Sequence, residues 1–184
     1  MTPTGVVLTG GASRRMGSDK ALVLVDGVAM AARVAAALVG SGCDPVVCQG
    51  GDAGALAAVG LEVVPDAQPG EGAVIAILDA LTRHGGDLVV CACDLPWLDA
   101  TTVVRLLAVA SAEPAADVVV ACDADGPHLV AVWRSGARQP LEALVAEGVR
   151  SYRAVLDTLE TVRVDVPSAV VANVNKPEDL RRRR

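Results

Sequence analysis

The sequence is nearly devoid of aromatic residues. It contains no phenylalanine, one tyrosine and two tryptophans, although 52% of its 184 residues are hydrophobic. The core must therefore be filled by alanine, valine and leucine, which suits closely packed helices and strands. A chain of this length buries roughly 70% of the surface that it exposes when unfolded, so we expect a single domain over residues 1–184.

Long hydrophobic runs are missing as well. No run approaches the ~18 apolar residues of a transmembrane helix. The first residues, MTPTGVVLTGG, also lack the basic stretch that opens a secretory signal peptide. We therefore expect a soluble, cytoplasmic protein without a membrane partner.

Cysteine pairs typical of zinc or redox centres are absent. None of the five cysteines belongs to a C-x-x-C pair or has a histidine nearby, and several fall within apolar runs that resemble strands. This pattern favours reduced, buried thiols that behave as small hydrophobic residues.

The chain has no excess of positive charge. Its formal net charge of −6 argues against non-specific binding of nucleic acid, which requires a basic face. The four arginines at the end of the sequence are interpreted as a solvated helix end, which the helix dipole favours. A phosphate-bearing ligand must then be met by a local basic site.

Apolar runs of strand length alternate with helical patterns along most of the chain, which is typical of an α/β protein with a mainly parallel sheet. Strands are expected at 5–9, 44–49, 61–66, 87–93 and 161–166, and helices at 29–42, 53–59, 73–85, 101–112, 136–147, 151–158 and 176–180. Residues 21–27 are expected to be extended and to end in a turn. The segment 117–134 is expected to form two strands joined by a turn, which adds an antiparallel neighbour. Because the run at 87–93 is continuously apolar, we expect it at the centre of a three-layer α/β/α fold.

The segment TGGASRRMGSDK (9–20) follows the first expected strand. Its glycines allow main-chain N–H groups to approach an anion, and its basic residues supply the opposite charge; they are Gly10, Gly11, Gly17, Arg14, Arg15 and Lys20. Lys20 stands out because the chain has one other lysine but fourteen arginines. The segment matches neither the Walker A pattern nor the G-x-G-x-x-G dinucleotide pattern.

Two further segments carry oxygen ligands. In CDLPWLD (93–99), Asp94 follows the expected central strand, at the sheet edge where open α/β sheets bind ligands. A carboxylate there suits Mg²⁺, although Asp94 could instead cap the following turn. In NVNKPEDL (173–180), Asn173 and Asn175 offer amide groups ahead of a helix start.

The segment LTGGASRRMGSDK resembles the L-x-G-G-x-S-x-R-M-G-x-D-K signature of nucleotidyltransferases that join a nucleotide to a phosphorylated acceptor. It is most similar to the molybdenum cofactor guanylyltransferases, the MobA family. CDLPWLD and NVNKPEDL resemble that family's C-D-x-P and N-x-N-T-P-E-D-L motifs. The resemblance implies a Rossmann-like sheet of the nucleotide-diphospho-sugar transferase type.

The resemblance also implies a reaction, in which GMP passes from GTP to the terminal phosphate of molybdopterin and pyrophosphate is released. It implies Arg15, Lys20 and Asp94 as catalytic residues, with Mg²⁺ held by Asp94 and Asn175. Nucleotide contacts are implied for Leu8, Thr9, Gly10, Gly11, Lys20, Gln49, Asp66 and Asp94. The expected partners are GTP, molybdopterin and, transiently, other proteins of cofactor biosynthesis.

The chain departs from the family pattern at several positions. Gln49 stands where relatives often carry asparagine, and PGEG (69–72) lacks the usual Pro-Leu. His128 resembles a family histidine, but a lone histidine at a strand start is more often structural. A cytidylyltransferase, a sugar-phosphate nucleotidyltransferase and a non-catalytic GTP-binding module remain as alternatives.

Overall fold

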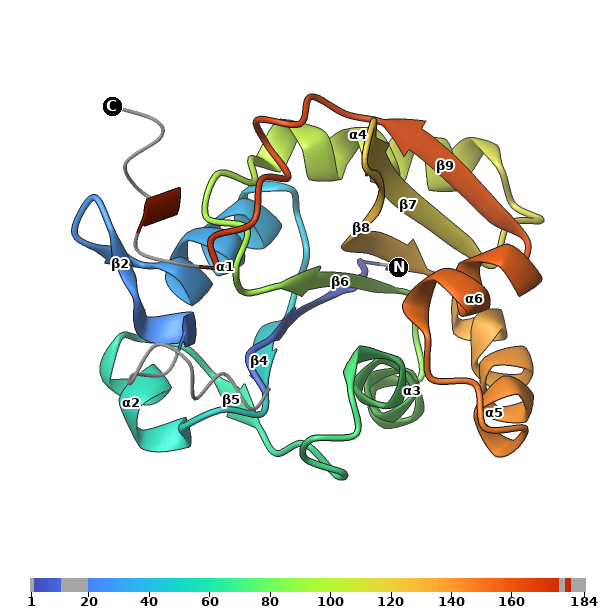
Figure 1. Ribbon diagram of the computed structural model, residues 1–184, viewed down its shortest axis with the longest axis horizontal. Coiled ribbons are helices and arrows are strands. Elements are labelled where there is room, and N and C mark those ends of the chain that lie inside the picture. Colours follow the sequence, from blue (N-terminus) through green and yellow to red (C-terminus); the bar gives the residue numbers. More distant parts are fainter. Residues whose placement is uncertain (1, 11–19, 176–177, 180–184) are drawn as a thin grey trace.

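The strands that the sequence predicts form one seven-stranded sheet in the computed structural model, which describes residues 2–10, 20–175 and 178–179 (Figure 1). The strands of this sheet are β1 (Thr4–Leu8), β4 (Val46–Gln49), β5 (Val63–Val64), β6 (Leu88–Ala92), β7 (Val118–Asp123), β8 (Gly126–Trp133) and β9 (Thr161–Asp165). Their order across the sheet is β5-β4-β1-β6-β8-β7-β9. β6 is therefore the central strand, as predicted from its continuous apolar run.

The sheet is parallel except at β8, which pairs antiparallel with both β6 and β7. β1 pairs in parallel with β4 on one side and with β6 on the other, and β9 pairs in parallel with β7. The carboxyl ends of the parallel strands therefore meet at one edge. The predicted mainly parallel sheet with an antiparallel strand is confirmed.

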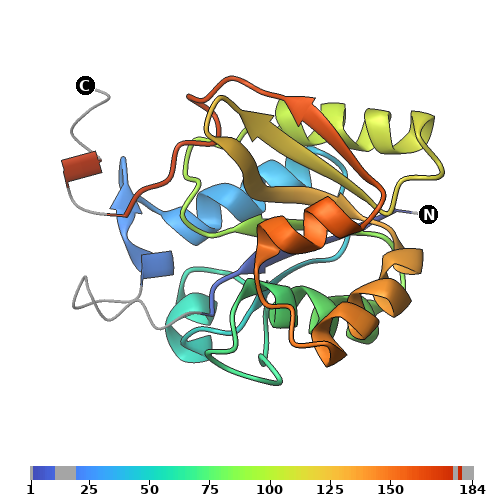
Figure 2. The ribbon, with the colours of Figure 1, turned by 45° about the vertical axis from the view of Figure 1, so that its right-hand side comes forward.

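Helices cover both faces of the sheet (Figures 1 and 2). They are α1 (Met30–Gly40), α2 (Ala53–Ala58), α3 (Ala73–His84), α4 (Ala100–Ala112), α5 (Arg138–Ala146) and α6 (Tyr152–Thr158), with 3-10 turns η2 (Lys20–Leu22) and η3 (Ser135–Ala137). α1 and α4 pack on one face, and α3, α5 and α6 on the other. No described helix is long and apolar enough to cross a membrane.

Alternation along β6 divides the core into two halves. Val89 and Cys91 face α1 and α4, whereas Leu88 and Val90 face α3 and α5, and all four are fully buried. Burial on both faces explains why this strand is apolar throughout. Valine, alanine and leucine provide most of both halves, as the lack of phenylalanine requires.

One local expectation is wrong in part. Residues 21 and 22 belong to the 3-10 turn η2 rather than to an extended piece, and extended structure begins at β2 (Leu24–Val25). The turn expected at its end is present, because Asp26 and Gly27 have φ values of 51° and 81° and connect β2 to β3 (Val28–Ala29). Two positive φ values are typical of a tight type I′ hairpin. The expected helix at 176–180 lies largely outside the described residues.

All five cysteines are buried thiols that take no part in a disulfide. Burial raises the pKa of the Cys48 thiol to about 11, and it raises the pKa of Cys91 further. A thiol that stays protonated at neutral pH is a poor nucleophile and a poor metal ligand. The cysteines are therefore part of the core, as the sequence indicates.

Candidate active site

The candidate site lies at the edge where the parallel strands end. Thr9 follows β1, Gln49 ends β4, Asp66 follows β5 by two residues, and Asp94 follows β6 by two. In the sheet, β4 lies on one side of β1 and β6 on the other, so the direction of the strand order changes at β1. The carboxyl end of β1 is therefore a topological switch point. Open α/β sheets bind ligands at such a point.

Lys20 lies between two oxygen-bearing side chains at this edge. Its Nζ donates to Asp94 Oδ2 and to Asn175 Oδ1, both at 2.6 Å. The side chains of Lys20 and Asp94 are 13% and 18% exposed, so the ion pair is largely shielded from water. A shielded pair contributes little net stability because desolvation offsets its attraction. Its main consequence is to fix the position of the ammonium group.

The carboxy-terminal segment is fastened to the Asp94 turn. Val174 N donates to the main-chain oxygen of Asp94 at 2.9 Å, and Asn175 N donates to Asp179 Oδ2 at 2.8 Å. The Val174 side chain is fully buried in a small cluster with Val25 and Met30. Asn175 is thereby held beside Asp94 although 81 residues separate them in the sequence.

Arg33 of α1 hydrogen-bonds to the same turn. Its Nε donates to Pro96 O at 2.8 Å, and its guanidinium also reaches Val25 O in the β2–β3 hairpin at 3.3 Å. One side chain thus connects the turn that carries Asp94 with the hairpin that follows Lys20. The sequence offered no signal for this role, because Arg33 sits in an alanine-rich helix like any surface arginine.

The ends of β1 and β4 approach each other closely at their glycines. The Thr9 hydroxyl donates to Gln49 O and to Gly50 O, and Gly10 N donates to Gln49 O at 3.0 Å. A Cβ on Gly50 would lie 2.9 Å from Gly10 Cα, so no other residue fits there without displacing the main chain. Gly50 and Gly51 also have positive φ values of 77° and 82°. This pair of glycines belongs to the site, although the sequence interpretation did not single it out.

Replacing Gly50 by alanine is expected to lower the free energy of unfolding by about 1–3 kcal/mol, because it combines a left-handed conformation with a clash. Gly60→Ala is the matched control, since Gly60 has a φ of 81° but no atom within 4 Å of the added Cβ. Urea unfolding of both variants separates the clash from the backbone strain. Equal losses in the two variants would contradict the close approach of Gly50 to Gly10.

Asp66 faces the Gly10 turn, whereas the Gln49 side chain is engaged elsewhere. Asp66 Oδ2 lies 3.2 Å from the position of a Cβ on Gly10. Gln49 is 1% exposed, and its Nε2 donates to Ala76 O at 2.9 Å on α3. Gln49 therefore supports the site through its main-chain oxygen, and direct contact of its side chain with a nucleotide stays a prediction.

The remaining predicted residues divide into two groups. Leu8 is 8% exposed and its side chain packs in the core, so the side chain is not available to a ligand. Only its main chain could contribute to the site. Gly11 and Arg15 lie outside the described residues. The structure thus brings together Thr9, Gly10, Lys20, Asp66, Asp94 and Asn175.

Comparison with known proteins identifies the family. A model of the MobA-like NTP transferase domain matches residues 5–164. The chain belongs to the MobA-like NTP transferase family. A protein of Mycobacterium marinum named "Probable molybdenum cofactor guanylyltransferase" is 36% identical over 182 residues, which cover 96% of this chain and 90% of the relative. A protein of the same name from Mycobacterium avium is 33% identical over 187 residues, covering 98% and 94% of the two chains.

Solved structures of MobA-like NTP transferases and their neighbours share the fold. Molybdopterin-guanine dinucleotide biosynthesis protein A of Archaeoglobus fulgidus superposes with a TM-score of 0.78 at 27% identity, covering 97% of this chain and 95% of the other. A CMP:2-keto-3-deoxy-manno-octonic acid synthetase reaches a TM-score of 0.75 at 14% identity, covering 99% and 96%. The second match concerns the fold alone, and it confirms the expected nucleotide-diphospho-sugar transferase architecture.

The histidine that resembles one in MobA-like proteins is tied to the β7–β8 hairpin. His128 Nε2 lies 2.8 Å from Asp123 Oδ1, which also accepts from Asp125 N at 2.9 Å. Hydrogen bonds from His128 and Ser168 lower the pKa of Asp123 to about 2. These contacts close the hairpin, which supports the structural interpretation of His128.

Asp123 is expected to make stability depend on acid pH. Its folded pKa of about 2 lies below its ordinary value of 3.8, so its contribution is complete above pH 3.8 and is lost as the pH falls toward 2. Asp123→Asn should therefore lower the free energy of unfolding at pH 6, with a smaller difference from the unmodified protein at pH about 3. The measurement is urea unfolding at both pH values.

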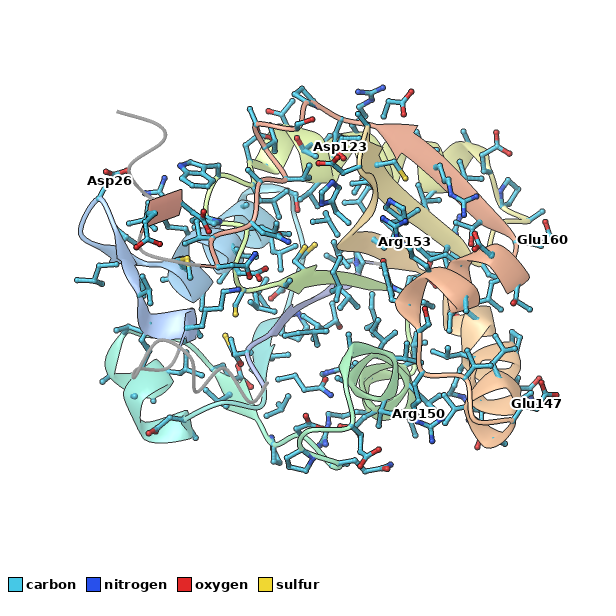
Figure 3. All side chains as sticks on the ribbon, viewed as in Figure 1. Asp26, Asp123, Glu147, Arg150, Arg153 and Glu160 are labelled. Atoms are coloured by element: carbon cyan, nitrogen blue, oxygen red, sulfur yellow. The ribbon has the colours of Figure 1, made fainter. Side chains whose placement is uncertain are left out.

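Asp26→Asn provides the control for this pH dependence. The Asp26 carboxylate is 81% exposed at the tip of the β2–β3 hairpin, far from the end of β7 that carries Asp123 (Figure 3). Asparagine followed by glycine also suits this turn. A pH-independent effect of Asp123→Asn would show that the carboxylate has no special role in the hairpin.

Proposed function

We propose that this protein is a molybdenum cofactor guanylyltransferase that transfers GMP from GTP to the terminal phosphate of molybdopterin. The observation that carries the proposal is the cluster of Lys20, Asp94 and Asn175 beside the glycine turns at the carboxyl edge of the sheet. Membership of the MobA-like NTP transferase family and the names of the mycobacterial relatives favour guanylyl transfer over the cytidylyl and sugar-phosphate alternatives.

In the proposed reaction, an oxygen of the acceptor's terminal phosphate attacks the α-phosphorus of GTP. A new P–O–P bond forms, the bond between the α- and β-phosphates breaks, and its electron pair leaves with pyrophosphate. Such a transfer needs positioning and charge stabilisation rather than a covalent intermediate. We assign these two tasks to residues at the carboxyl edge of the sheet.

Each group has a proposed role. Lys20, together with Arg15, holds the triphosphate and stabilises charge on the departing pyrophosphate, because an ammonium group can follow a phosphate oxygen. The main chain at Leu8, Thr9, Gly10 and Gly11 cradles the nucleotide. Asp66 contacts the nucleotide from the loop after β5, with Gln49 of β4 behind it.

We also propose that Asp94 and Asn175 hold Mg²⁺. Their oxygens already receive a cation in this structure, the Lys20 ammonium at 2.6 Å from each, so the donor set fits a positive charge. The described residues contain no group of three or more histidine, cysteine, aspartate or glutamate side chains able to enclose a metal. One carboxylate suffices for Mg²⁺, which usually takes one or two together with nucleotide phosphates. When bound, Mg²⁺ would polarise phosphate oxygens as a Lewis acid.

Protection against heat tests the nucleotide preference. GTP with Mg²⁺ is expected to raise the melting temperature, because a ligand that binds only the folded state stabilises it. CTP, UTP and ATP at the same concentration are the controls and should protect less. Stronger protection by CTP would favour a cytidylyltransferase, and protection by none of the four would contradict the nucleotide site.

The proposed setting of the reaction is the cytoplasm. Molybdopterin synthesis precedes this step, so transient contacts with other proteins of cofactor biosynthesis are expected. Both statements stay predictions.

A further inference from the structure

The Asp79 side chain of α3 accepts hydrogen bonds from residues that follow or end two strands near the candidate site. Its Oδ2 accepts from Gln49 Nε2 at 3.1 Å, at the end of β4, and from Ala67 N at 3.3 Å, in the loop after β5. The Asp79 side chain is 17% exposed. A carboxylate on a surface helix usually pairs only with a residue one turn away. This one instead connects three elements.

Arg83, one turn further along α3, strengthens the same connection. Its Nη2 donates to Pro65 O at 3.2 Å and lies 3.4 Å from Asp79 Oδ2. Pro65 and Ala67 are the two chain neighbours of Asp66. The main chain is therefore held to α3 immediately before and immediately after Asp66.

The orientation of Asp66 follows from these contacts. Its Oδ1 accepts from Gln68 N at 3.1 Å, which closes the loop on itself, and its Oδ2 faces the Gly10 turn. The loop over residues 65–68 has few other hydrogen bonds among the described residues. Without Asp79, Ala67 N would lose its described acceptor, and Gln49 Nε2 would keep only Ala76 O.

We propose that Asp79 is a positioning residue that sets the affinity for the nucleotide by holding Asp66 toward the Gly10 turn. Asp79 acts through the loop and touches no substrate. The inference rests on the proposed function, in which Asp66 contacts the nucleotide. The position is not apparent from the sequence, where Asp79 is one acidic residue on an amphipathic helix.

The test is calorimetric titration of the full-length protein with GTP and Mg²⁺, without acceptor. Asp79→Ala is expected to raise the dissociation constant about tenfold, which corresponds to about 1.4 kcal/mol. Asp79→Asn keeps an amide oxygen that can accept from Ala67 N, so it should recover most of the affinity. It also serves as the variant to measure if Asp79→Ala does not fold.

A double-mutant cycle distinguishes positioning from a general loss of structure. On an Asp66→Ala background, Asp79→Ala should change the dissociation constant little, because residues that act through one another are not additive. Thr82→Ala is the control, since its hydroxyl donates only within α3, to Leu78 O at 2.8 Å. It should leave the affinity unchanged.

Three results would overturn the inference. Unchanged GTP affinity in Asp79→Ala would contradict it while leaving the proposed function intact. An equal tenfold loss on the Asp66→Ala background would show that Asp79 does not act through Asp66. Failure of the unmodified protein to bind any nucleoside triphosphate would overturn the proposed function, and the inference with it.

Discussion

Replacing Lys20 by methionine should lower turnover at least about a hundredfold, the loss typical of removing one charge-stabilising donor from an active site. Methionine keeps much of the side-chain length but removes the ammonium group that lies 2.6 Å from both Asp94 and Asn175. The charge developing on the pyrophosphate would then lack the cation that we assign to it. Steady-state release of pyrophosphate from GTP and molybdopterin measures the effect.

Two further variants control for the removal of a charge. Lys20→Arg retains the positive charge, but a guanidinium is wider and forked, so it should recover only part of the turnover. Arg163 of β9 forms an exposed ion pair with Asp157 of α6, so Arg163→Met removes a cation far from the proposed chemistry and should leave turnover unchanged. Near-normal turnover of Lys20→Met would mean that the lysine serves the folded structure rather than the reaction.

Asp94→Ala is expected to cause a loss of similar size and, in addition, to weaken the dependence on Mg²⁺. It removes the one carboxylate that meets Lys20 in the described structure, at a position shielded from water. Removal of a preorganised charge from such a position costs at least about a hundredfold in turnover. Pyrophosphate release measured over a range of Mg²⁺ concentrations separates a weaker metal site from a slower reaction.

The control for Asp94 lies five residues further along the same turn. Asp99 caps α4 by accepting from Thr102 N at 2.7 Å, and asparagine caps helices as well as aspartate does. Asp99→Asn should therefore leave both turnover and its Mg²⁺ dependence unchanged. Near-normal pyrophosphate release by Asp94→Ala would rule out the metal assignment.

The fold was largely predictable from the sequence because the apolar pattern of a strand indicates which of its faces are buried. β6 is apolar throughout since both of its faces are covered, and this identified it as the centre of the sheet. Residues 20–22 were harder, because one lysine and two apolar residues suit an extended piece as well as a 3-10 turn. In the structure Ala21 of this turn is fully buried in the core, and such tertiary packing cannot be read from three residues.

The sequence predicted members for the candidate site but could not predict their geometry. Family motifs pointed to Lys20, Asp94 and Asn175, but they assigned the lysine to a phosphate-binding segment and the two oxygen-bearing side chains to separate metal-binding segments. The structure places the ammonium directly between the two oxygens. Spacing along a chain does not determine which side chains meet across a sheet edge.

Supporting residues were the least predictable. Arg33, Gly50 and Asp79 hold main-chain atoms of other segments, and such contacts leave no motif in a single sequence. Gln49 illustrates the converse, because its place in the family pattern suggested a nucleotide contact while its amide group binds α3. A polar side chain at a strand end can face the ligand or the helix behind it.

The central claim is that the carboxyl edge of this sheet transfers GMP to molybdopterin. The most direct test supplies GTP labelled at its α-phosphate, together with Mg²⁺ and molybdopterin, and follows both the label and pyrophosphate. We predict that the label moves to the pterin in step with pyrophosphate release, and that Lys20→Met and Asp94→Ala fail to transfer it. Binding of GTP and Mg²⁺ without transfer of the label would contradict the claim and identify a nucleotide-binding module instead.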